Sequence, residues 1–260
     1  MSKIYYIGDW AVQLGPTYAE TPFNYANKGT VVINYGKWLK SAIESGGKHE
    51  VISVPTWEFY LLGPGEWERI LKEYDIIIFS DVEAKNFQLA PQFFSRELFG
   101  NQILTFPDRV RLTVDALKNG THMIFAGGWL SFNGELGKGG WGRTNLKEIL
   151  PVECLEVEDL VESTEGFGAT VLKPGHPILK DIDFSSLPPV LGYNKVKPRK
   201  GCEVLATWKG SDDPLVAAGQ FGKGKVVAYT SDPAPHWGCN FVFWKEYNQF
   251  WLNICNWLME

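Results

Sequence analysis

The sequence predicts an α/β fold with a mainly parallel sheet, helices on both faces of that sheet and an antiparallel extension. Two observations lead to this fold class. In the first half, short apolar runs alternate with helical patterns, as they do in βαβ units. In the second half, β-rich stretches follow one another, and residues 221–224 read FGKG, which favours a hairpin turn. Because strands joined by a hairpin are antiparallel, the second half supplies the extension.

Four runs in the first half predict strands. Each run is apolar at consecutive positions, which is typical of strands covered on both faces. The predicted strands are residues 4–7, 51–54, 76–79 and 123–126. Helices are predicted over residues 35–45, 66–72 and 107–118. The third helix has Pro107 in its first turn and ends at Asn119 and Gly120, which are common residues at helix boundaries.

The second half predicts four β-stretches and a long final helix. The β-stretches are residues 168–172, 203–208, 215–220 and 225–230. The final helix, residues 242–258, has apolar side chains at helical spacing, so we expect that stripe to lie in the core. A glycine-rich loop over residues 134–142 precedes a short helix at 145–149, and it lacks the G-K-[ST] ending of a phosphate-binding loop. We expect that loop to be a mobile or closely packed lid, and the chain to form one domain over residues 1–260.

Composition excludes several classes of protein. With 260 residues and 45% apolar content, the chain can bury a sizeable core. Its formal charge of −5 is too small and too dispersed to indicate a nucleic-acid partner. We find no signal-peptide pattern and no membrane-spanning apolar run, and the four cysteines form no C-x-x-C pair. We therefore expect a cytoplasmic protein with no membrane partner and no cofactor.

Acidic side chains follow three of the predicted strands, at the edge where open parallel sheets bind ligands. Asp9 follows the first strand, Asp81 the third and Asp232 the last, with His236 four residues further on. We expect these four to converge, although each aspartate has an alternative role as a helix or turn cap. Prolines before His236 would hold its imidazole where it can transfer a proton. The ligand types suit a metal, but no short motif such as H-E-x-x-H joins them, so we expect no metal site.

Residues 121–132, THMIFAGGWLSF, run from a buried strand into a glycine turn. In a strand-to-helix turn of this kind, the residue that projects toward the substrate is the nucleophile of many acyl-transfer enzymes. That position holds Trp129, whose indole cannot attack a carbonyl. Ser131 and Cys239 are alternative nucleophiles, but proximity in sequence gives neither a base nor an oxyanion site.

Aromatic residues make up 14% of the chain, and several lie near the candidate site. Packing of the pocket wall is one interpretation, and a stacking surface for a sugar or another planar-faced ligand is the other. The predicted ligand-binding residues are Asp9, Asp81, Gly128, Trp129 and Trp237. The candidate catalytic residues are His236, Ser131 and Asp232.

Taken together, these motifs resemble the class I glutamine amidotransferase-like superfamily, and within it a family that lacks the nucleophilic cysteine. The resemblance spans nearly the whole chain. It rests on Gly8-Asp9, Tyr74-Asp75, Ser80-Asp81, residues 127–132, Gly134, Gly137, Arg143-Thr144, Leu150-Pro151-Val152, His176-Pro177-Ile178, Leu191-Gly192-Tyr193-Asn194, Ser231-Asp232 and Pro235-His236-Trp237.

The resemblance implies a flavodoxin-like fold and a position for each member of the catalytic triad. True class I enzymes have a cysteine at the turn and an H-x-E pair after the last strand of the domain. Here His236 matches the histidine, but Trp129 replaces the cysteine and Gly238 stands in the place of the glutamate. Glutamine hydrolysis by the usual thiolate route is therefore not expected, since loss of a triad nucleophile costs on the order of 10⁶ in turnover.

Three functions remain open. The first is binding of a small polar ligand, a carbohydrate or a metabolite, without turnover. The second is a hydrolase in which His236 and an aspartate act on water as general acid and base. The third is an assembly subunit with a vestigial site, and a homo-oligomer is left open with it.

Overall fold

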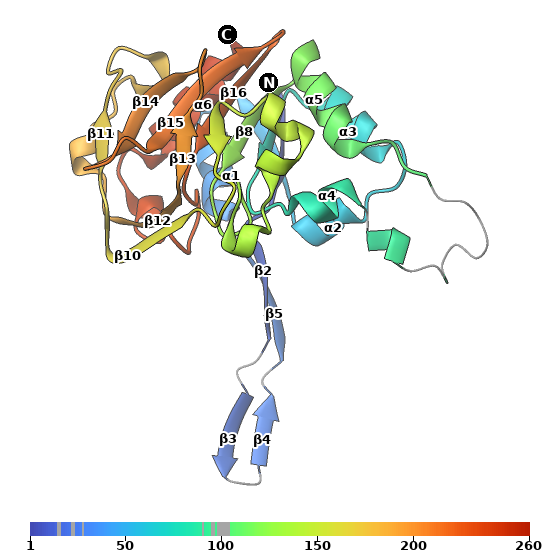
Figure 1. Ribbon diagram of the computed structural model, residues 1–260. Coiled ribbons are helices and arrows are strands. Elements are labelled where there is room, and N and C mark those ends of the chain that lie inside the picture. Colours follow the sequence, from blue (N-terminus) through green and yellow to red (C-terminus); the bar gives the residue numbers. More distant parts are fainter. Residues whose placement is uncertain (15–16, 22–23, 28, 90, 95–96, 98–104) are drawn as a thin grey trace.

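The computed structural model describes residues 1–14, 17–21, 24–27, 29–89, 91–94, 97 and 105–260. An eight-stranded sheet runs through the molecule in the order β11-β14-β15-β16-β8-β7-β1-β6 (Figure 1). Five strands form its parallel part: β1 (Ser2–Ile7), β6 (His49–Val54), β7 (Ile76–Phe79), β8 (His122–Ala126) and β16 (Gly224–Tyr229). Counted along the parallel strands only, the order is 2-1-3-4-5, which is the flavodoxin-like arrangement.

The antiparallel extension lies next to β16, as the hairpin predicted. It consists of β15 (Pro214–Phe221), β14 (Glu203–Trp208) and β11 (Ala169–Val171). The β15–β16 register ends with Phe221 opposite Gly224. The predicted turn at residues 221–224 is therefore confirmed, and so is the fold class.

Helices cover both faces of the sheet, and each face has its own core. One core contains α1 (Lys37–Glu44) and α6 (Tyr247–Met259), and the other contains α3 (Glu66–Glu73) and α5 (Arg109–Asn119). Two short helices, α2 (Thr56–Tyr60) and α4 (Ala84–Gln88), belong to the second side. Successive residues of β1 alternate between the two cores, so all four from Ile4 to Ile7 are buried. That is why the parallel strands read as unbroken apolar runs.

The structure differs from the predicted elements at the last helix. A 3₁₀ turn, Phe241–Phe243, is followed by Trp244 in an extended conformation (φ −64°, ψ 132°), so helix α6 begins only at Tyr247. The residues at 145–149 likewise form a 3₁₀ turn, Asn145–Glu148, and not an α-helix.

Four strands of the second half that lie outside the main sheet were not predicted. β9 (Val152–Cys154) pairs with β13 (Val196–Pro198), and β10 (Leu160–Phe167) pairs with β12 (Val190–Asn194). β10 is only partly buried along its length, so it shows neither a continuous apolar run nor a strict alternation. The β10–β12 pair supplies residues to the site described below.

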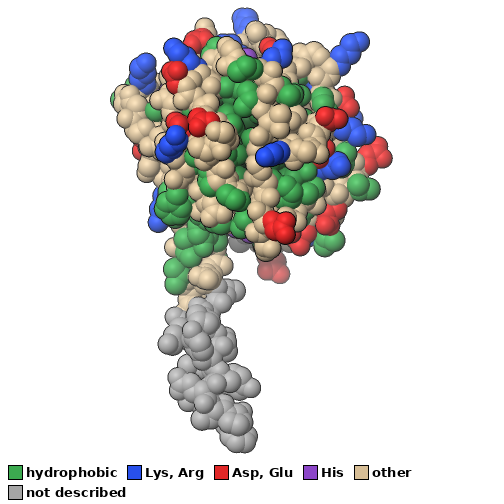
Figure 2. Space-filling model, turned by 90° about the vertical axis from the view of Figure 1, so that its left-hand side faces the viewer, with side chains coloured by type: hydrophobic (Ala, Val, Ile, Leu, Met, Phe, Trp, Pro, Cys, Tyr) green, Lys and Arg blue, Asp and Glu red, His purple; other side chains and the backbone are tan. Residues whose placement is uncertain are grey.

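A two-stranded ribbon extends from the body directly after Asp9 (Figures 1 and 2). β2 (Trp10–Leu14) pairs with β5 (Thr30–Asn34), and β3 (Thr17–Thr21) pairs with β4 (Asn24–Asn27). At its base the ribbon exposes Val12, Val31 and Val32. Elsewhere, the helices that the structure describes are all too short or too polar to cross a bilayer.

Candidate functional site

Four neighbouring strands, β16, β8, β7 and β1, end side by side at one edge of the sheet. Asp232 follows β16, Gly128 follows β8, Asp81 follows β7 and Asp9 follows β1. Asp9 and Asp81 flank the point where the strand order reverses, which is where open α/β sheets bind ligands. The structure thus brings together the three aspartates that the sequence placed after separate strands.

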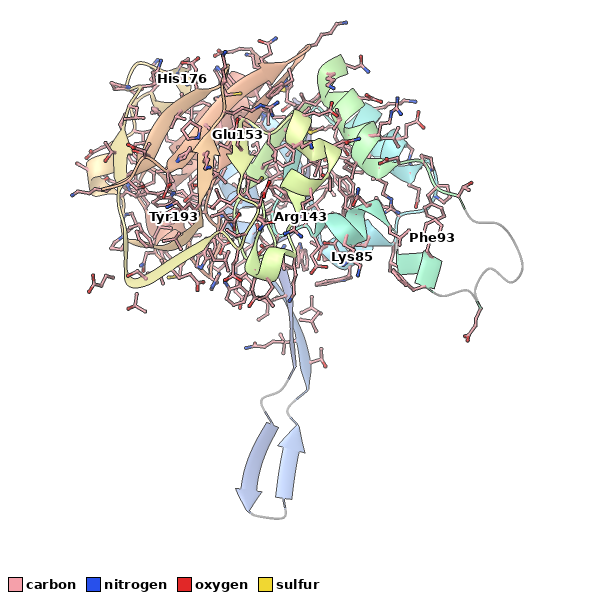
Figure 3. All side chains as sticks on the ribbon, in the orientation of Figure 1. Lys85, Phe93, Arg143, Glu153, His176 and Tyr193 are labelled. Carbon is pink, nitrogen blue, oxygen red and sulfur yellow. The ribbon has the colours of Figure 1, made fainter. Side chains whose placement is uncertain are left out.

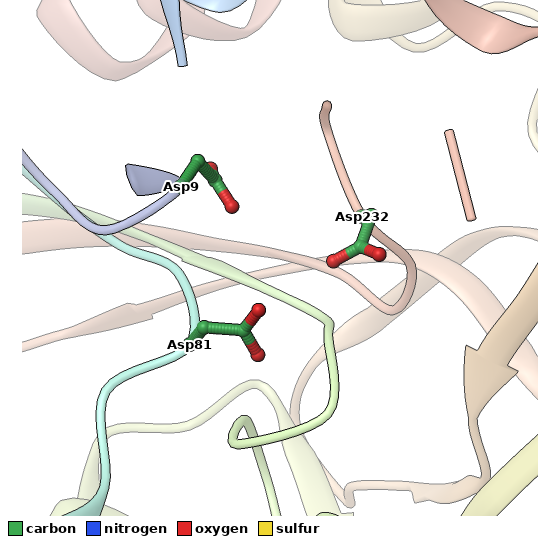
Figure 4. A group of neighbouring side chains, drawn as sticks. All are labelled: Asp9, Asp81 and Asp232. Carbon is green, nitrogen blue, oxygen red and sulfur yellow. The ribbon is translucent and has the colours of Figure 1, made fainter. Parts of the chain in front are cut away.

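We call Asp9, Asp81 and Asp232 the acid cluster. One carboxylate oxygen from each of these residues lies within 4.8 Å of the corresponding oxygens of the other two (Figure 4). Strands β16 and β7 are separated by β8, a span of about 9–10 Å. Their aspartates meet over the end of β8, where Gly128 has no side chain. A Cβ on Gly128 would lie 2.7 Å from Asp232 Oδ1 and closer still to Asp81 Oδ1.

Asp9 and Asp81 both adopt left-handed backbone conformations, with φ of 55° and 52°. Aspartate tolerates this region better than most residues, but it remains uncommon. A Cβ on Gly8 would collide with the Ser80 carbonyl oxygen, so glycine lets the two strand ends lie against each other. At the end of β1, Asp9 accepts hydrogen bonds from the Ser80 hydroxyl (3.0 Å) and from the Tyr6 hydroxyl.

Asp232 holds His236 in place. Its Oδ2 accepts from His236 Nδ1 at 2.8 Å and from the Trp237 backbone N–H at 3.1 Å. Its Oδ1 is buried and has no hydrogen-bond partner. The predicted proximity of Asp232 and His236 is therefore present in the structure as an aspartate–imidazole pair.

Burial of the acid cluster raises the pKa of all three carboxyl groups. Desolvation is the main cause for each of them, and for Asp9 and Asp81 the charge of Asp232 is the second. The pKa of Asp81 rises to about 7, and that of Asp9 lies well above its usual range. Burial lowers the pKa of His236, but the hydrogen bond and charge of Asp232 outweigh it, so the net shift is upward.

A second group, the rim cluster, consists of Trp129, Glu162, His236 and Trp237. Glu162 Oε1 accepts from the indole N–H groups of Trp129 (3.0 Å) and Trp237 (2.7 Å) and lies 3.9 Å from His236 Nε2. The Trp129 ring meets the His236 ring edge-on, with centroids 4.2 Å apart. Donation from Trp129 is the main cause that lowers the pKa of Glu162.

Backbone pairing explains how the rim cluster forms. Glu162 on β10 lies opposite Gly192 on β12. A Cβ on Gly192 would lie 2.6 Å from the Trp237 indole, so the glycine makes room for that ring. The ring's N–H can then reach Glu162 on the neighbouring strand.

We call the turn at residues 127–131 the elbow. Two of its backbone N–H groups donate hydrogen bonds to side chains of neighbouring segments. Gly128 N donates to Asn194 Oδ1 (2.8 Å), and Leu130 N donates to Asp81 Oδ1 (2.7 Å). In elbow hydrolases the N–H after the nucleophile forms part of the oxyanion hole. Here that N–H belongs to Leu130 and is occupied by a carboxylate.

The described residues of the elbow offer no exposed thiol or hydroxyl as a nucleophile. Trp129 occupies the nucleophile position, and 47% of it is exposed. Ser131 is fully buried, and its Oγ accepts from the Asp81 backbone N–H (3.0 Å). Burial raises the pKa of the Cys154 thiol to about 12, and Cys239 lies beyond His236, away from the elbow in the chain. His236 has hydrogen-bond or ion-pair contacts with Asp232 and Glu162 and none with Ser131.

Three hollows are relevant to ligand binding. One of about 320 Å³ borders the rim cluster and is lined by Glu162, Ser163, Thr164, Leu191, His236 and Trp237. Another of about 380 Å³ lies between α4 and the glycine-rich loop and includes Lys85 and Arg143, labelled in Figure 3. The largest, about 530 Å³, lies between α3 and α5 beside Tyr74 and Asp75, which precede β7, so it is at the opposite end of the strands from the acid cluster.

Sequence reasoning missed three polar residues that shape this region. Asn194 Nδ2 donates to the Gly128 carbonyl (3.0 Å) and to Asp159 Oδ1 (2.9 Å), and Asp159 accepts from two backbone N–H groups that follow the elbow. The third residue is Glu162. Asn194 closes the LGYN motif, which was noticed only as part of the resemblance. The other two residues carry no signal in the sequence, because their role depends on the unpredicted strands.

Comparison with known proteins places this geometry in a family. The family model described as "Putative glutamine amidotransferase" (GATase1-like) matches residues 25–260, and the chain belongs to this family. The search of curated proteins gave no match.

Solved structures share the fold of this chain. Cytoplasmic protein STM1381 from Salmonella typhimurium LT2 is 31% identical, with 98% of this chain and 99% of that chain covered and a TM-score of 0.83. Cytoplasmic protein STM3548 from Salmonella typhimurium is 27% identical, with 99% of each chain covered and a TM-score of 0.84. A thua-like protein from Parabacteroides merdae shares the fold at 11% identity, with 99% and 89% covered and a TM-score of 0.50.

The raised carboxyl pKa values predict an unusual pH dependence. The pKa of Asp81 is about 7 in the folded state, against 3.8 for the free side chain, so the folded chain binds more protons between these values. This contribution to stability is full below pH 3.8 and is lost as the pH rises through 7. Asp81→Asn should therefore raise the free energy of unfolding at pH 7.5, on the order of 1–4 kcal/mol, since one pKa unit is worth about 1.4 kcal/mol.

Chemical unfolding at pH 5.5 and pH 7.5 in buffer with a chelator measures this effect. Asn can keep both the left-handed backbone and the hydrogen bond from Leu130. Asp115→Asn, an exposed position on α5, is the matched control. If Asp81→Asn gave no more stability than Asp115→Asn at pH 7.5, the raised pKa would be refuted.

Removing the Asn194 side chain should destabilise the elbow. Asn194→Ala takes away the Asn194 Oδ1 acceptor of the buried Gly128 N–H and also removes the Asn194 Nδ2 donations to the Gly128 carbonyl and to Asp159 Oδ1; a buried group left unsatisfied costs about 1–3 kcal/mol. We expect a loss of about 2–4 kcal/mol in urea unfolding. Asn240→Ala removes one surface hydrogen bond, to the Pro189 carbonyl, and should cost less than about 1 kcal/mol. Equal losses for the two variants would show that Asn194 does not hold the elbow.

Proposed function

We propose that this protein binds a small polar ligand, of the carbohydrate class, at the rim cluster and does not hydrolyse glutamine. The observation that carries the proposal is the exposed Trp129 ring beside Glu162 and His236, two residues that line a hollow of about 320 Å³. Aromatic faces with a few fixed polar groups are the usual composition of ligand pockets. Asp9, Asp81 and Gly128 adjoin this surface through Asp232, which holds His236, and would contact the same ligand.

The lack of glutaminase activity is supported by more than the missing cysteine. Leu130 N–H, the donor that would stabilise an oxyanion, is bonded to Asp81. The Gly128 N–H is bonded to Asn194. A substrate carbonyl would have to displace a buried carboxylate before it could be polarised, so we expect neither acylation nor ammonia release.

The two structural relatives from Salmonella typhimurium are described as cytoplasmic proteins. We extend that location to this chain as part of the proposal, with a small molecule as its partner and no nucleic acid. The exposed Val12, Val31 and Val32 at the base of the ribbon support contact with a second copy, because a two-stranded ribbon has little stability alone.

Replacing Trp129 tests the ligand-binding proposal. D-glucose, D-galactose, D-mannose and lactose are titrated by calorimetry, together with glutamine and an ammonia assay. We expect at least one sugar to bind and Trp129→Ala to weaken it about 5- to 10-fold, since an aromatic stacking contact contributes about 1 kcal/mol. Phe243→Ala removes another exposed aromatic, outside the rim cluster, and should bind like the wild type.

Three outcomes would reject the proposal. The first is ammonia release from glutamine by the pure protein. The second is the absence of binding by every sugar, and the third is sugar binding that Trp129→Ala leaves unchanged.

The Asp232–His236 pair favours one alternative, a hydrolase that activates water. Nδ1 of His236 is held by Asp232, which leaves Nε2 on the side of the hollow. General acid–base catalysis by such a group contributes about 10²–10⁴ in rate. If the alternative holds, hydrolysis of nitrophenyl esters or glycosides should fall at least 100-fold in His236→Ala while the melting temperature changes little. Unchanged turnover, or no turnover in the wild type, would exclude it for these substrates.

A further inference from the structure

The acid cluster has two features that hydrogen bonding within the chain does not account for. Asp9, Asp81 and Asp232 each direct a carboxylate oxygen into one small volume, with these atoms within 4.8 Å of one another (Figure 4). Independently, Asp232 Oδ1 is buried and has no hydrogen-bond partner among the residues that the structure describes, and 96% of the side chain is out of contact with solvent. Buried polar atoms nearly always have a partner, and a bound ion is one of the standard explanations when they do not.

Protein cations do not neutralise these charges. Among the ion pairs of the described residues, none joins Asp9 or Asp81 to a lysine or arginine, and Asp232 pairs only with His236. His236 binds Oδ2, on the side of the carboxylate that faces the rim cluster. Oδ1 lies on the other side, near the Gly128 backbone and Asp81 Oδ1.

We propose that Asp9, Asp81 and Asp232 bind one divalent cation through their carboxylate oxygens. The proposal does not rest on the proposed function, because it needs no organic ligand at the rim cluster. The sequence did not predict a metal site because each ligand follows a different strand. Ligands that are so far apart in the sequence form no short motif.

The ligand chemistry and spacing indicate which cations fit. Carboxylate oxygens without a thiolate or imidazole ligand suit Ca²⁺, Mn²⁺ and Mg²⁺. Opposite ligands of Ca²⁺ are about 4.6–5.2 Å apart and those of Mg²⁺ about 4.0–4.2 Å, from their usual bond lengths. The oxygens lie within 4.8 Å of one another, which allows either spacing. Because Mg²⁺ demands near-ideal octahedral geometry and gives up its water reluctantly, whereas Ca²⁺ accepts flexible sets of oxygen ligands, we expect Ca²⁺ to bind more tightly than Mg²⁺.

Gly128 is part of this site through the side chain that it lacks. A Cβ at this position would overlap Asp81 Oδ1 and lie 2.7 Å from Asp232 Oδ1. Its φ of 145° also disfavours any other residue. Because Gly128 has no side chain, the carboxylates of Asp81 and Asp232 can approach each other from β7 and β16, which are not neighbouring strands.

The experiment titrates the chelator-treated full-length protein with CaCl₂, MnCl₂ and MgCl₂ at pH 7.5. Calorimetry gives the stoichiometry, the electron paramagnetic resonance signal of free Mn²⁺ gives an independent binding curve, and thermal unfolding gives the linked stabilisation. We expect one ion per chain and a rise in melting temperature of roughly 5–10 °C at 100 times the dissociation constant.

Two variants and a control make the result specific. Asp81→Asn removes one ligand charge and should weaken binding at least 10-fold while the apo protein stays folded. Gly128→Ala should also weaken binding, because it displaces Asp81 and Asp232. Asp115→Asn should bind like the wild type. No saturable binding of any of the three ions at millimolar concentration, or the same affinity in Asp81→Asn as in the wild type, would overturn the proposal whether or not a sugar binds at the rim cluster.

Discussion

Three carboxylates at one edge of a parallel sheet, that of Asp232 buried and those of Asp9 and Asp81 partly buried, are the constraint on which this site depends. Two unit charges 4.8 Å apart repel by about 3–4 kcal/mol at an effective dielectric constant of about 20. Local features at the strand ends offset this repulsion. Gly8 and Gly128 remove side chains that would separate the strand ends, and hydrogen bonds from Ser80, Leu130 and His236 stabilise one carboxylate each. The raised pKa values of the three carboxyl groups show that these features offset the unfavourable electrostatics only in part.

The elbow of this amidotransferase-like scaffold lies next to the acid cluster and is joined to it by the hydrogen bond from Leu130 to Asp81. The elbow keeps its backbone shape because Asn194 and Asp159 hold the segment that contains it. Its donors, however, are bonded to the protein's own side chains, and an indole replaces the nucleophile. Trp129 instead projects to the rim, where it contacts His236 and Glu162. What this edge of the sheet presents to a ligand is an aromatic and carboxylate surface in place of an acylation site.

Much of this could be predicted from the sequence, for a physical reason. Strands buried on both faces leave unbroken apolar runs, so the parallel sheet and the positions of Asp9, Asp81 and Asp232 after its strands followed directly. The convergence of these residues then follows from the shared direction of parallel strands. The start of α6 could not be placed, because Phe241 and Trp244 continue the apolar pattern although the backbone there forms a 3₁₀ turn and an extended residue in place of an α-helix. Glu162 and Asn194 were missed because they lie on β10 and β12, which were not predicted, and the partly buried β10 leaves no periodic signal.

The central claim is that the three carboxyl groups share one buried volume in solution. Carbon-13 NMR of the chain labelled at the aspartate carboxyl groups, titrated from pH 3 to pH 9 in metal-free buffer, measures their ionisation directly. The Asp81 signal is assigned as the one that disappears in Asp81→Asn. The account predicts that the Asp81 carboxyl titrates near pH 7 and that the pKa values of Asp9 and Asp232 also lie above the usual range of aspartate. Titration of all three at the ordinary pKa of aspartate, about 3.9, would contradict it.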